Sequence, residues 1–374
     1  MKYYVIAGEM SGDLHASLLI KNIKEQDPNA EFRCWGGDNM QAQGGKIVKH
    51  IKDLAIMGFI EVVANLKTVL GNISFCKKDI LEYNPDAIIL TDYPGFNLRI
   101  AKFAHKRGFK VFYYISPQVW AWKKGRIKTM KKVLERLYVI LPFEKPFYDK
   151  NNMEVEYYGN PLLDEIALFR QKGDDRQVFL EKYNLGKKPI VAILPGSRTQ
   201  EIKSILPTQL TIYDKYQDQF DFVVAGVNTH SVEFYKKYMG DRDVKLIFND
   251  TYNILNVASA GLITSGTATL ETALFDVPQV VCYKASVASY AIVQIFLNIG
   301  FISLVNLILN KEAVKELVQS QWNENELDKE FQKICFDKEY INVMKRNYAE
   351  LRTILGDAGT SKQIATSILN HLKK

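Results

Sequence analysis

Two carboxylates in the front half of the chain stand where acid–base chemistry could occur. Asp92 directly follows the apolar segment 87–91, and Glu9 and Ser11 lie in a glycine-containing turn at 8–13 that follows the first apolar segment of the chain. A carboxylate at a strand tip could serve as a general base, and the N-terminus of a helix after such a turn could bind an anion or a sugar. Helix capping uses the same residue types, so both interpretations stay open at this point.

A second group of residues, in the rear half of the chain, could bind a diphosphate. Arg198 follows an expected strand and could hold a phosphate in a fork geometry. Ser265, Gly266 and Thr267 follow another strand and open a helix, where backbone amides and the helix dipole stabilise negative charge. Glu271, one turn into that helix, could accept hydrogen bonds from a ribose. The alternatives are a surface arginine and simple capping by the hydroxyl groups.

Aromatic and basic residues follow one another between 116 and 136. Trp120 and Trp122 stand on an expected loop after a strand, and seven cations come next in the chain: Lys123, Lys124, Arg126, Lys128, Lys131, Lys132 and Arg136. Such a mixture suits RNA, phosphorylated ligands or an anionic membrane surface, while a solvated helix face is the simpler alternative. No recognised nucleic-acid signature accompanies it, so no nucleic-acid partner is predicted.

Several other kinds of chemistry lack support. Neither the G-x-G-x-x-G dinucleotide fingerprint nor a Walker A loop occurs, and there is no nucleophile elbow. The five histidines are scattered and the four cysteines form no C-x-x-C pair. The segment Asp241-Arg242-Asp243 has the D-x-D form that some metal-dependent glycosyltransferases use, but a charged loop is the better interpretation. We therefore predict no cofactor and no metal.

The elements that must position these residues alternate in a parallel-sheet rhythm. Apolar, β-branched segments without polar alternation are typical of strands covered by helices on both faces. The expected strands are 3–8, 32–35, 87–91, 110–115 and 136–141 in the front half, and 190–194, 222–225, 244–248, 261–264 and 279–283 in the rear half. Helical patterns such as 201–217 and 268–275 lie between them. The sequence predicts an α/β protein with two doubly wound domains.

Composition suggests where the domains begin and end. Residues 164–188 are charged and carry no strand signal, so they are interpreted as a connector between a first domain at 1–165 and a second at 185–344. Beyond residue 311 the chain is expected to be helical with little strand signal. Helices at 345–374 are expected to return to the first domain.

Charge and hydropathy bear on the location of the protein. The net charge of +7 favours anionic partners. The first apolar segment is too short for a signal-peptide core, so we expect a cytoplasmic protein. The uncharged stretch 285–310 is long enough to cross a bilayer, but polar residues recur through it and Gly300 splits it. Buried or interfacial helices are therefore expected there.

Together, these motifs resemble the lipid-A-disaccharide synthase family of bacteria over essentially the whole chain. The matching segments, in the family's order, are GEMSGD at 8–13, MGFIEV at 57–62, Asp92 with Pro94, Phe96 and Asn97, SPQVWAW at 116–122, LPFEK at 141–145, LPGSR at 194–198, SGTATLE at 265–271 and SLVNL at 303–307. The resemblance implies a GT-B glycosyltransferase, with two Rossmann-like domains facing a cleft and C-terminal helices packed back on the body. The implied reaction joins UDP-2,3-diacylglucosamine to 2,3-diacylglucosamine 1-phosphate (lipid X), forms a β-1,6 linkage with inversion and releases UDP.

The resemblance also implies roles for particular residues. Asp92 matches the family's essential aspartate and is assigned as the base or the acceptor-positioning group, with Glu9 and Ser11 facing the donor loop across the cleft. The implied donor-binding residues are Arg198, Ser265, Gly266, Thr267, Glu271 and Asn306. The expected acceptor or membrane surface comprises Met57, Phe59, Ile60, Val62, Val63, Leu66, Trp120, Trp122, Lys123, Lys124 and Arg126. Ordinary core packing is the alternative for the amphipathic stretch 57–70.

Further implied partners are the inner-membrane surface, bound peripherally, and a second copy of the chain in a homodimer. Three positions depart from the family pattern: Asn160 replaces a common histidine, Val305 a common proline and Gly95 an acidic residue. Fold alone would also fit a UDP-N-acetylglucosamine 2-epimerase or the glycosyltransferase of peptidoglycan lipid synthesis. A non-catalytic UDP-sugar-binding protein at the membrane surface is the alternative from another class.

Overall fold

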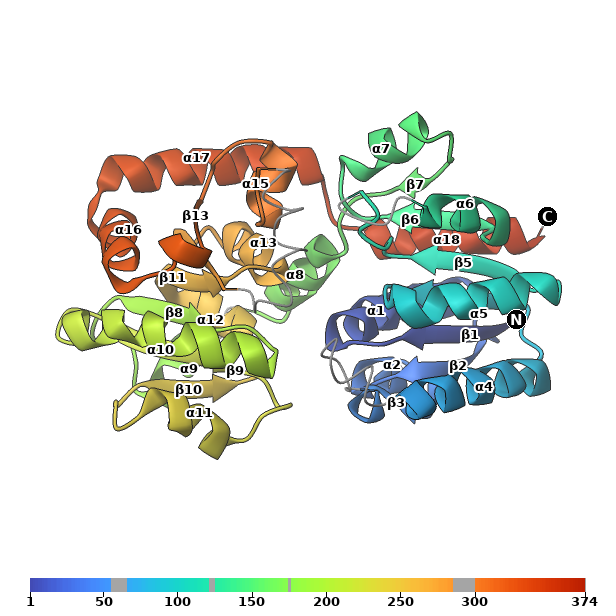
Figure 1. Ribbon diagram of the computed structural model, residues 1–374, viewed down its shortest axis with the longest axis horizontal. Coiled ribbons are helices and arrows are strands. Elements are labelled where there is room, and N and C mark those ends of the chain that lie inside the picture. The colour runs from blue at the N-terminus through green and yellow to red at the C-terminus, as the bar shows by residue number, and fades with distance from the viewer. Residues whose placement is uncertain (55–65, 121–124, 174–175, 285–299, 374) are drawn as a thin grey trace. The chain divides into compact units, whose positions relative to one another are not determined.

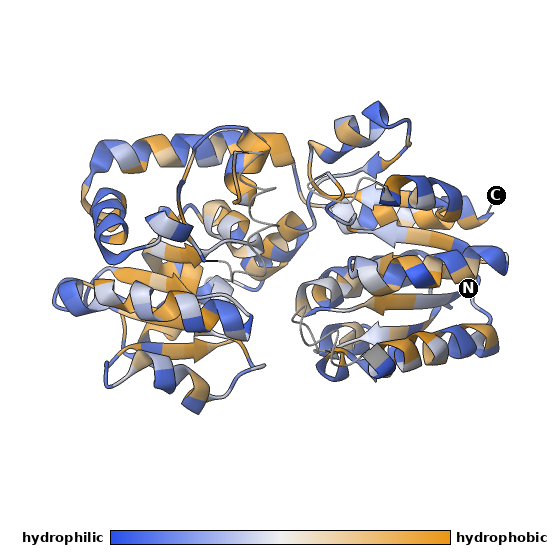
Figure 2. Ribbon diagram, in the orientation of Figure 1, coloured by the Kyte–Doolittle hydropathy of each residue, from blue (hydrophilic) through white to orange (hydrophobic). Residues whose placement is uncertain are grey.

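The computed structural model describes residues 1–54, 66–120, 125–173, 176–284 and 300–373 (Figure 1). The chain forms two compact units, one made of Met1–Glu165 with Leu355–Lys374 and the other of Ile166–Ile354. Each unit holds one parallel sheet with helices packed against it. The predicted α/β class with two doubly wound domains is confirmed. Apolar residues concentrate on the strands and on the helix faces that cover them (Figure 2).

The first unit is built on a seven-stranded sheet. Its strands are β1 (Lys2–Ala7), β2 (Glu31–Gly36), β3 (Lys46–His50), β4 (Ala87–Thr91), β5 (Lys110–Tyr114), β6 (Arg136–Val139) and β7 (Glu156–Tyr157). They are ordered β3-β2-β1-β4-β5-β6-β7, and all pairs are parallel. Its helices are α1 (Met10–Gln26), α2 (Asp38–Ala42), α4 (Leu66–Tyr83), α5 (Pro94–Lys106), α6 (Arg126–Val133) and α7 (Glu144–Lys150), with a 3-10 turn η1 (Ile51–Asp53).

Alternate residues of the central strands form two cores, one on each face of this sheet. Tyr4 and Ile88 point into a core shared with α4, α5 and α6, while Val5 and Ile89 point into a core shared with α1 and the last helix, α18 (Thr360–Lys373). Strands buried on both faces are apolar at every position, which explains the unbroken hydrophobic segments in the sequence.

The C-terminal helix α18 is fixed to the first unit by polar as well as apolar contacts. The carboxylate of Asp164 accepts hydrogen bonds from the backbone N–H groups of Gly359 at 2.5 Å, Thr360 at 3.2 Å and Ser361 at 2.7 Å. These groups stand at the start of α18 and have no partner within the helix. Ile364 lies in the core. The helix therefore belongs to the unit that the chain left at Glu165.

The second unit is built on a six-stranded parallel sheet. Its strands are β8 (Ile190–Leu194), β9 (Asp221–Gly226), β10 (Lys245–Phe248), β11 (Ala258–Thr264), β12 (Gln279–Tyr283) and β13 (Lys315–Val318), in the order β10-β9-β8-β11-β12-β13. Its helices are α9 (Arg176–Tyr183), α10 (Thr199–Tyr216), α11 (Val232–Met239), α12 (Thr251–Val257), α13 (Thr267–Leu274), α15 (Leu304–Leu309), α16 (Glu324–Phe336) and α17 (Lys338–Leu355), with a 3-10 turn η3 (Gln319–Gln321). Helix α8 (Leu162–Gln171) leads from the first unit into it.

The structure departs from the sequence-based expectation in two respects. The segment interpreted as a connector carries the helices α8 and α9. Three strands were not foreseen, namely β3, β7 and β13, and all three lie at an edge of their sheet. Edge strands in proteins are short and carry charged residues, so they lack the continuous apolar pattern by which the inner strands are recognised.

Candidate functional site

Each sheet has one point at which the strand order reverses. In the first unit it lies between β1 and β4, and in the second between β8 and β11. Ligands of open α/β sheets bind beyond the carboxyl ends of the strands at such a point. Glu9 and Asp92 follow the first pair of strands, and Arg198 and Ser265 follow the second pair. The sheet topology thus gathers the predicted residues into one group in each unit.

Asp92 stands in an unusual backbone conformation at the tip of β4. Its φ is 45° and that of Tyr93 is 47°, so two consecutive non-glycine residues are left-handed. The backbone is held there because the Asp92 N–H donates to Tyr114 at 3.2 Å, while its carbonyl accepts from Asn97 Nδ2 at 2.8 Å and from the Tyr113 hydroxyl. The N-cap position of α5 is held by Tyr93, the residue after Asp92. Strain of this kind collects at functional sites.

The turn after β1 packs directly against the Asp92 turn. A Cβ added at Gly8 would lie 2.4 Å from Tyr93 Cγ, so only glycine allows the ring to lie there. Glu9 stands at the N-cap of α1, and its charge, second to burial, raises the pKa of Tyr93. Ser11 is exposed in the first turn of α1. Glu9, Tyr93 and Asp92 therefore share one end of the sheet.

Asp13, from the same turn, has a structural task instead. It is buried, and its carboxylate accepts the backbone N–H groups of Gly37 at 2.6 Å, Asn39 at 3.1 Å and Met40 at 3.3 Å. These groups begin α2, so the carboxylate stabilises the start of that helix. The capping alternative concerned the helix α1 that directly follows the turn, whereas Asp13 caps α2.

Substituting Gly8 with Ala should test the packing between the two turns. The added methyl group must displace the Tyr93 ring and with it the Asp92 backbone, so we expect a loss of about 1–3 kcal/mol in the free energy of unfolding and a turnover lower by about tenfold. Urea unfolding and initial rates measure the two effects. Gly95→Ala is the matched control, because a Cβ there meets nothing within 4 Å. Equal rates for the two variants would contradict the argument.

The expected acceptor or membrane surface is described only in part. Met57, Phe59, Ile60, Val62, Val63, Trp122, Lys123 and Lys124 lie outside the described residues, as does the side chain of Leu66. Trp120 packs edge-on against Phe143, with ring centroids 4.9 Å apart. Burial and the Asp92 charge raise the pKa of Tyr113, and the Arg126 guanidinium partly offsets them. Arg126 and Asp92 thus act on the same phenol.

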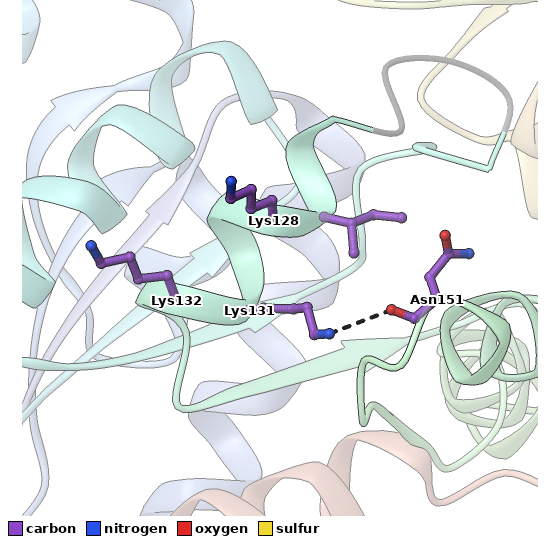
Figure 3. Close-up of a pocket in the computed structure, with 5 residues that line it drawn as sticks. Lys128, Lys131, Lys132 and Asn151 are labelled. Atoms are coloured by element: carbon purple, nitrogen blue, oxygen red, sulfur yellow. Dashed lines mark hydrogen bonds between the residues drawn. The ribbon is translucent and has the colours of Figure 1, made fainter.

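A shallow groove on α6 collects further positive charge (Figure 3). It is lined by Ile127, Lys128, Lys131, Lys132 and Asn151, and the Lys131 ammonium donates to the Asn151 carbonyl at 3.5 Å. Lys128, Lys131 and Lys132 therefore stand on the solvent side of α6, with Ile127 turned toward the core. Arg136 instead begins β6 and pairs with Glu156 at 3.1 Å.

In the second unit, Arg198 stands at the N-cap of α10 directly after the β8 turn. Its side chain is 64% exposed, with Nη1 3.5 Å from Glu201 Oε1. Glu201 Oε2 accepts the backbone N–H groups of Ser197 and Arg198, each at 3.2 Å, and so fixes the turn. Sequence reasoning missed Glu201, although an acidic residue three positions after an N-cap is a known capping pattern.

The turn after β11 leaves an exposed glycine at the start of α13. Gly266 has φ 150° and ψ −160°, a conformation that only glycine adopts readily, and space beyond its Cα is open. Ser265 is fixed from both sides, because its N–H donates to Cys282 at 3.1 Å and its hydroxyl to Ile302 at 3.1 Å. Thr267 begins α13 and is exposed, and Glu271 accepts from the Tyr252 hydroxyl at 3.5 Å. The turn is suited to an anion.

Asn306 lies at the centre of a buried hydrogen-bond network. It is fully buried, and its amide oxygen accepts from Ala313 at 2.8 Å and Val314 at 3.0 Å. Its amide nitrogen donates to the Val314 carbonyl at 2.9 Å and to Glu316 Oε1 at 2.8 Å. Both donors and both lone pairs are used, so no capacity remains for a donor sugar. These contacts give Asn306 a supporting role in the segment 302–316, and its part in donor binding stays a prediction.

That support reaches the turn around Ser265 through Glu316, which sequence reasoning also missed. Glu316 accepts the backbone N–H groups of Ile302 and Ser303, each at 2.9 Å, in addition to the Asn306 amide. Ile302 in turn receives the hydroxyl of Ser265. The motif SLVNL thus acts indirectly, because its Asn306 binds Glu316, which fixes the segment to which the Ser265 hydroxyl donates.

Glu144 is a buried carboxylate to which sequence reasoning assigned no role. It is 1% exposed, and Oε2 accepts the N–H groups of Ile140 at 3.1 Å and Leu141 at 2.9 Å. Burial raises its pKa from 4.5 to about 7, against the lowering effect of these hydrogen bonds and of the Ser116 hydroxyl.

This raised pKa predicts a pH dependence of stability. Between pH 4.5 and about 7 the folded state keeps a proton that the unfolded state has lost, so the free energy of unfolding falls as pH rises and levels off above that window. Glu144→Gln removes this contribution. The free energy of unfolding of the variant, relative to that of the wild type, should therefore rise by roughly 3 kcal/mol between pH 4.5 and 7.5. Urea unfolding at several pH values measures it, with the exposed Glu135→Gln as control. Parallel pH curves for wild type and Glu144→Gln would contradict the prediction.

Comparison with known proteins places these features in a family. The sequence profile described as lipid-A-disaccharide synthetase matches residues 3–366. The chain belongs to that family. A lipid-A-disaccharide synthase of Syntrophus aciditrophicus (strain SB) is 35% identical over 376 residues, covering 99% of this chain and 97% of the relative. One from Geobacter metallireducens is 32% identical at the same coverages, and lipid-A-disaccharide synthase 1 of Legionella pneumophila (strain Paris) is 34% identical over 95% and 93%.

Solved structures agree at the level of the fold. The UDP-GlcNAc 2-epimerase of Neisseria meningitidis bound to UDP-GlcNAc superimposes with a TM-score of 0.71 at 14% identity, covering 99% of this chain and 100% of the other. The calicheamicin glycosyltransferase CalG4 gives 0.61 at 12% identity, with coverages of 100% and 98%. The fold is therefore the GT-B type that was expected. As a member of the lipid-A-disaccharide synthetase family, the chain is a glycosyltransferase that forms the lipid A disaccharide.

Two features of the described residues bear on the expected membrane contact and metal independence. No helix among them is both long and apolar enough to cross a bilayer. The stretch 285–299 lies outside them. In the described ranges, no three His, Cys, Asp or Glu side chains are grouped in a way that could hold a metal ion.

Proposed function

We propose that the reaction is a single inverting displacement in which Asp92 receives the proton of the acceptor hydroxyl. The acceptor 6-hydroxyl of lipid X attacks the anomeric carbon of UDP-2,3-diacylglucosamine, the new C–O bond forms as the bond to UDP breaks, and the hydroxyl proton passes to Asp92. The observation that supports this is the strained Asp92 turn at the switch point of the first sheet, where Tyr113, Tyr114 and Asn97 hold the backbone.

The leaving UDP requires stabilisation of its diphosphate charge. We assign this to the turn around Ser265, Gly266 and Thr267, with the Arg198 guanidinium as a second, charged donor. Glu271, one turn into α13, is assigned to the ribose. Preorganised donors of this kind lower the barrier because they need not reorient as charge develops.

Incubation with the two diacylated sugars tests the proposal. Disaccharide 1-phosphate and UDP should appear in equal amounts. Conversion of UDP-N-acetylglucosamine at its C2 would favour the epimerase alternative, transfer to a peptidoglycan lipid would favour the other transferase, and UDP-sugar binding without turnover would favour the non-catalytic one. Any of these results without disaccharide would overturn the proposal.

The proposed mechanism has no step that needs a metal. Backbone amides and Arg198 provide the positive potential at the diphosphate, so we expect turnover to persist in an excess of chelator. The measurement is the initial rate with and without chelator after extensive dialysis. A rate that collapses and returns on addition of a divalent cation would reverse this assignment.

We further propose that the first unit contacts the inner-membrane surface, from which its acylated substrates come. Supporting this are Arg126, the basic groove on α6 and the presence of two acyl chains on each implied substrate. Sedimentation with anionic vesicles, compared with zwitterionic ones, tests it. Equal recovery in the supernatant for both would contradict it.

A further inference from the structure

An aromatic stack of Trp35, Phe96 and Tyr93 reaches the carboxyl end of the first sheet beside the Asp92 turn. The ring centroids of Trp35 and Phe96 lie 5.2 Å apart, and those of Phe96 and Tyr93 lie 5.4 Å apart with an interplanar angle of 19°. Trp35 and Phe96 are buried, whereas Tyr93 at the end of the stack is half-buried. The mechanism proposed above uses none of these three rings.

The buried end of the stack is fixed by polar contacts. Trp35 Nε1 donates to the Tyr4 hydroxyl at 2.7 Å, and that hydroxyl donates to Asp79 Oδ2 at 2.7 Å. The Asp79 carboxylate also pairs with the Arg33 guanidinium, whose Nε donates to it at 2.9 Å. Tyr4 stands on β1, Arg33 on β2 and Asp79 on α4, so three elements share this network. The rings that follow in the stack therefore rest on a rigid support.

The half-buried end of the stack has a conformation that tyrosine rarely adopts. Tyr93 has φ 47°, in the left-handed region that favours glycine and asparagine. It occupies the N-cap position of α5, where a serine, threonine, aspartate or asparagine would stabilise the helix, and among the described contacts its side chain makes no capping hydrogen bond. A Cβ at Gly8 would collide with the Tyr93 ring. Helix capping and backbone preference therefore do not account for a tyrosine here.

The Tyr93 ring lies where the acceptor sugar has to bind if Asp92 is the base. Gly8 follows β1 and Tyr93 follows β4, so their contact lies at the switch point between these two strands. A base must stand within hydrogen-bond reach of the hydroxyl whose proton it takes. The C–H groups on one face of a sugar ring are attracted to the negative face of an aromatic ring, while carboxylates such as those of Glu9 and Asp92 accept the hydroxyl groups at its rim.

We propose that Tyr93 is an acceptor-binding residue whose aromatic ring stacks against the sugar of the acceptor and so places the 6-hydroxyl at Asp92. This inference rests on the proposed function of Asp92 and adds a contact to the same site. Phe96 and Trp35 hold the ring in place before the acceptor arrives, so little conformational freedom is lost when it binds. The contact uses the ring and not the phenol hydroxyl.

The first experiment measures the Kd of the acceptor, 2,3-diacylglucosamine 1-phosphate, without donor, by calorimetric titration at a fixed concentration of non-ionic detergent. Tyr93→Asn removes the ring and suits the left-handed backbone, while Tyr93→Leu removes the ring and keeps an apolar contact with Phe96. We expect the Kd to rise about tenfold in both variants and to stay within about twofold of the wild type in Tyr93→Phe.

Tyr83→Leu is the matched control for these variants. Tyr83 is a half-buried tyrosine of the same unit, and its ring centroid lies 5.6 Å from Nζ of Lys2, at the opposite end of the sheet. An unchanged Kd in both ring-free variants of Tyr93 would overturn the inference. So would a loss in Tyr93→Phe as large as that in Tyr93→Asn, which would assign the effect to the hydroxyl, or an equal loss in Tyr83→Leu, which would make it a general effect on the unit.

The second experiment separates the sugar from its acyl chains. With acceptors of shorter chains, the Kd of Tyr93→Asn should stay about tenfold above that of the wild type, because the lost contact is with the sugar. A ratio that falls toward one as the chains shorten would place an acyl chain on the ring and overturn the inference. In turnover, Tyr93→Asn should raise KM for the acceptor about tenfold and leave KM for the donor near that of the wild type.

The wild type distinguishes the two ways in which the idea can fail. A wild type that neither binds this acceptor nor forms disaccharide would contradict the proposed function, and the inference would fall with it. A wild type that binds the acceptor and forms disaccharide, with ring-free variants that do the same equally well, would contradict only the stacking role of Tyr93.

Discussion

Asp92→Asn is expected to lower turnover by about 100-fold or more, which corresponds to about 2.7 kcal/mol of transition-state stabilisation. The amide has nearly the shape of the carboxylate but cannot take up the acceptor proton. Asparagine also tolerates the left-handed backbone found at this position, where φ is 45°. The substitution should therefore remove the chemistry and leave the fold intact. Steady-state rates of disaccharide formation measure the effect.

Two controls make that result specific. UDP affinity should be unchanged in Asp92→Asn, because its proposed determinants lie in the second unit. Asp149→Asn changes an aspartate of the same unit whose side chain is 53% exposed and pairs with Lys145 at 3.6 Å, and it should leave the rate near that of the wild type. A rate for Asp92→Asn within a few-fold of the wild type would remove Asp92 from the proton transfer.

Asn306→Ala is expected to destabilise the second unit by about 3–5 kcal/mol. The substitution leaves the buried N–H groups of Ala313 and Val314 and the Val314 carbonyl without the amide that now satisfies them. Glu316 loses a partner as well. Glu316 holds Ile302, whose carbonyl accepts the hydrogen bond from the Ser265 hydroxyl. Because Ser265 belongs to the proposed diphosphate turn, we also expect the Kd for UDP to rise by about tenfold.

Thermal or urea unfolding and UDP titration measure these two effects separately. Asn325→Ala is the matched control, since Asn325 is exposed on α16 and its loss should cost no more than about 0.5 kcal/mol. Stability near that of the control would show that the Asn306 network contributes little. If the variant were as stable as the control but no longer bound UDP, direct contact between Asn306 and the donor would be favoured.

The inner strands of both sheets, and the turns at their ends that carry the candidate residues, could be predicted from the sequence because they have local signals. The unbroken apolar run 87–91 and the polar residue after it indicated a buried strand with Asp92 at its tip. The glycines at 8 and 266 likewise indicated close approach or unusual backbone, as found. Edge strands and the helices within 164–188 lacked such signals.

What only the tertiary structure decided is which polar residues serve the fold and which are left for chemistry. Asp92 and Asn306 were both candidates by residue type, but Asn306 is saturated by its own surroundings. Asp13, in the turn that carries Glu9, caps another helix. Glu144, Glu201 and Glu316 gain their importance from partners brought together by the fold. The sequence by itself determined the strand-and-helix order, the family and the positions of the strand-tip turns, since local patterns carry them. Hydrogen-bond saturation and burial depend on contacts between segments far apart in the chain, and these exist only once the chain has folded.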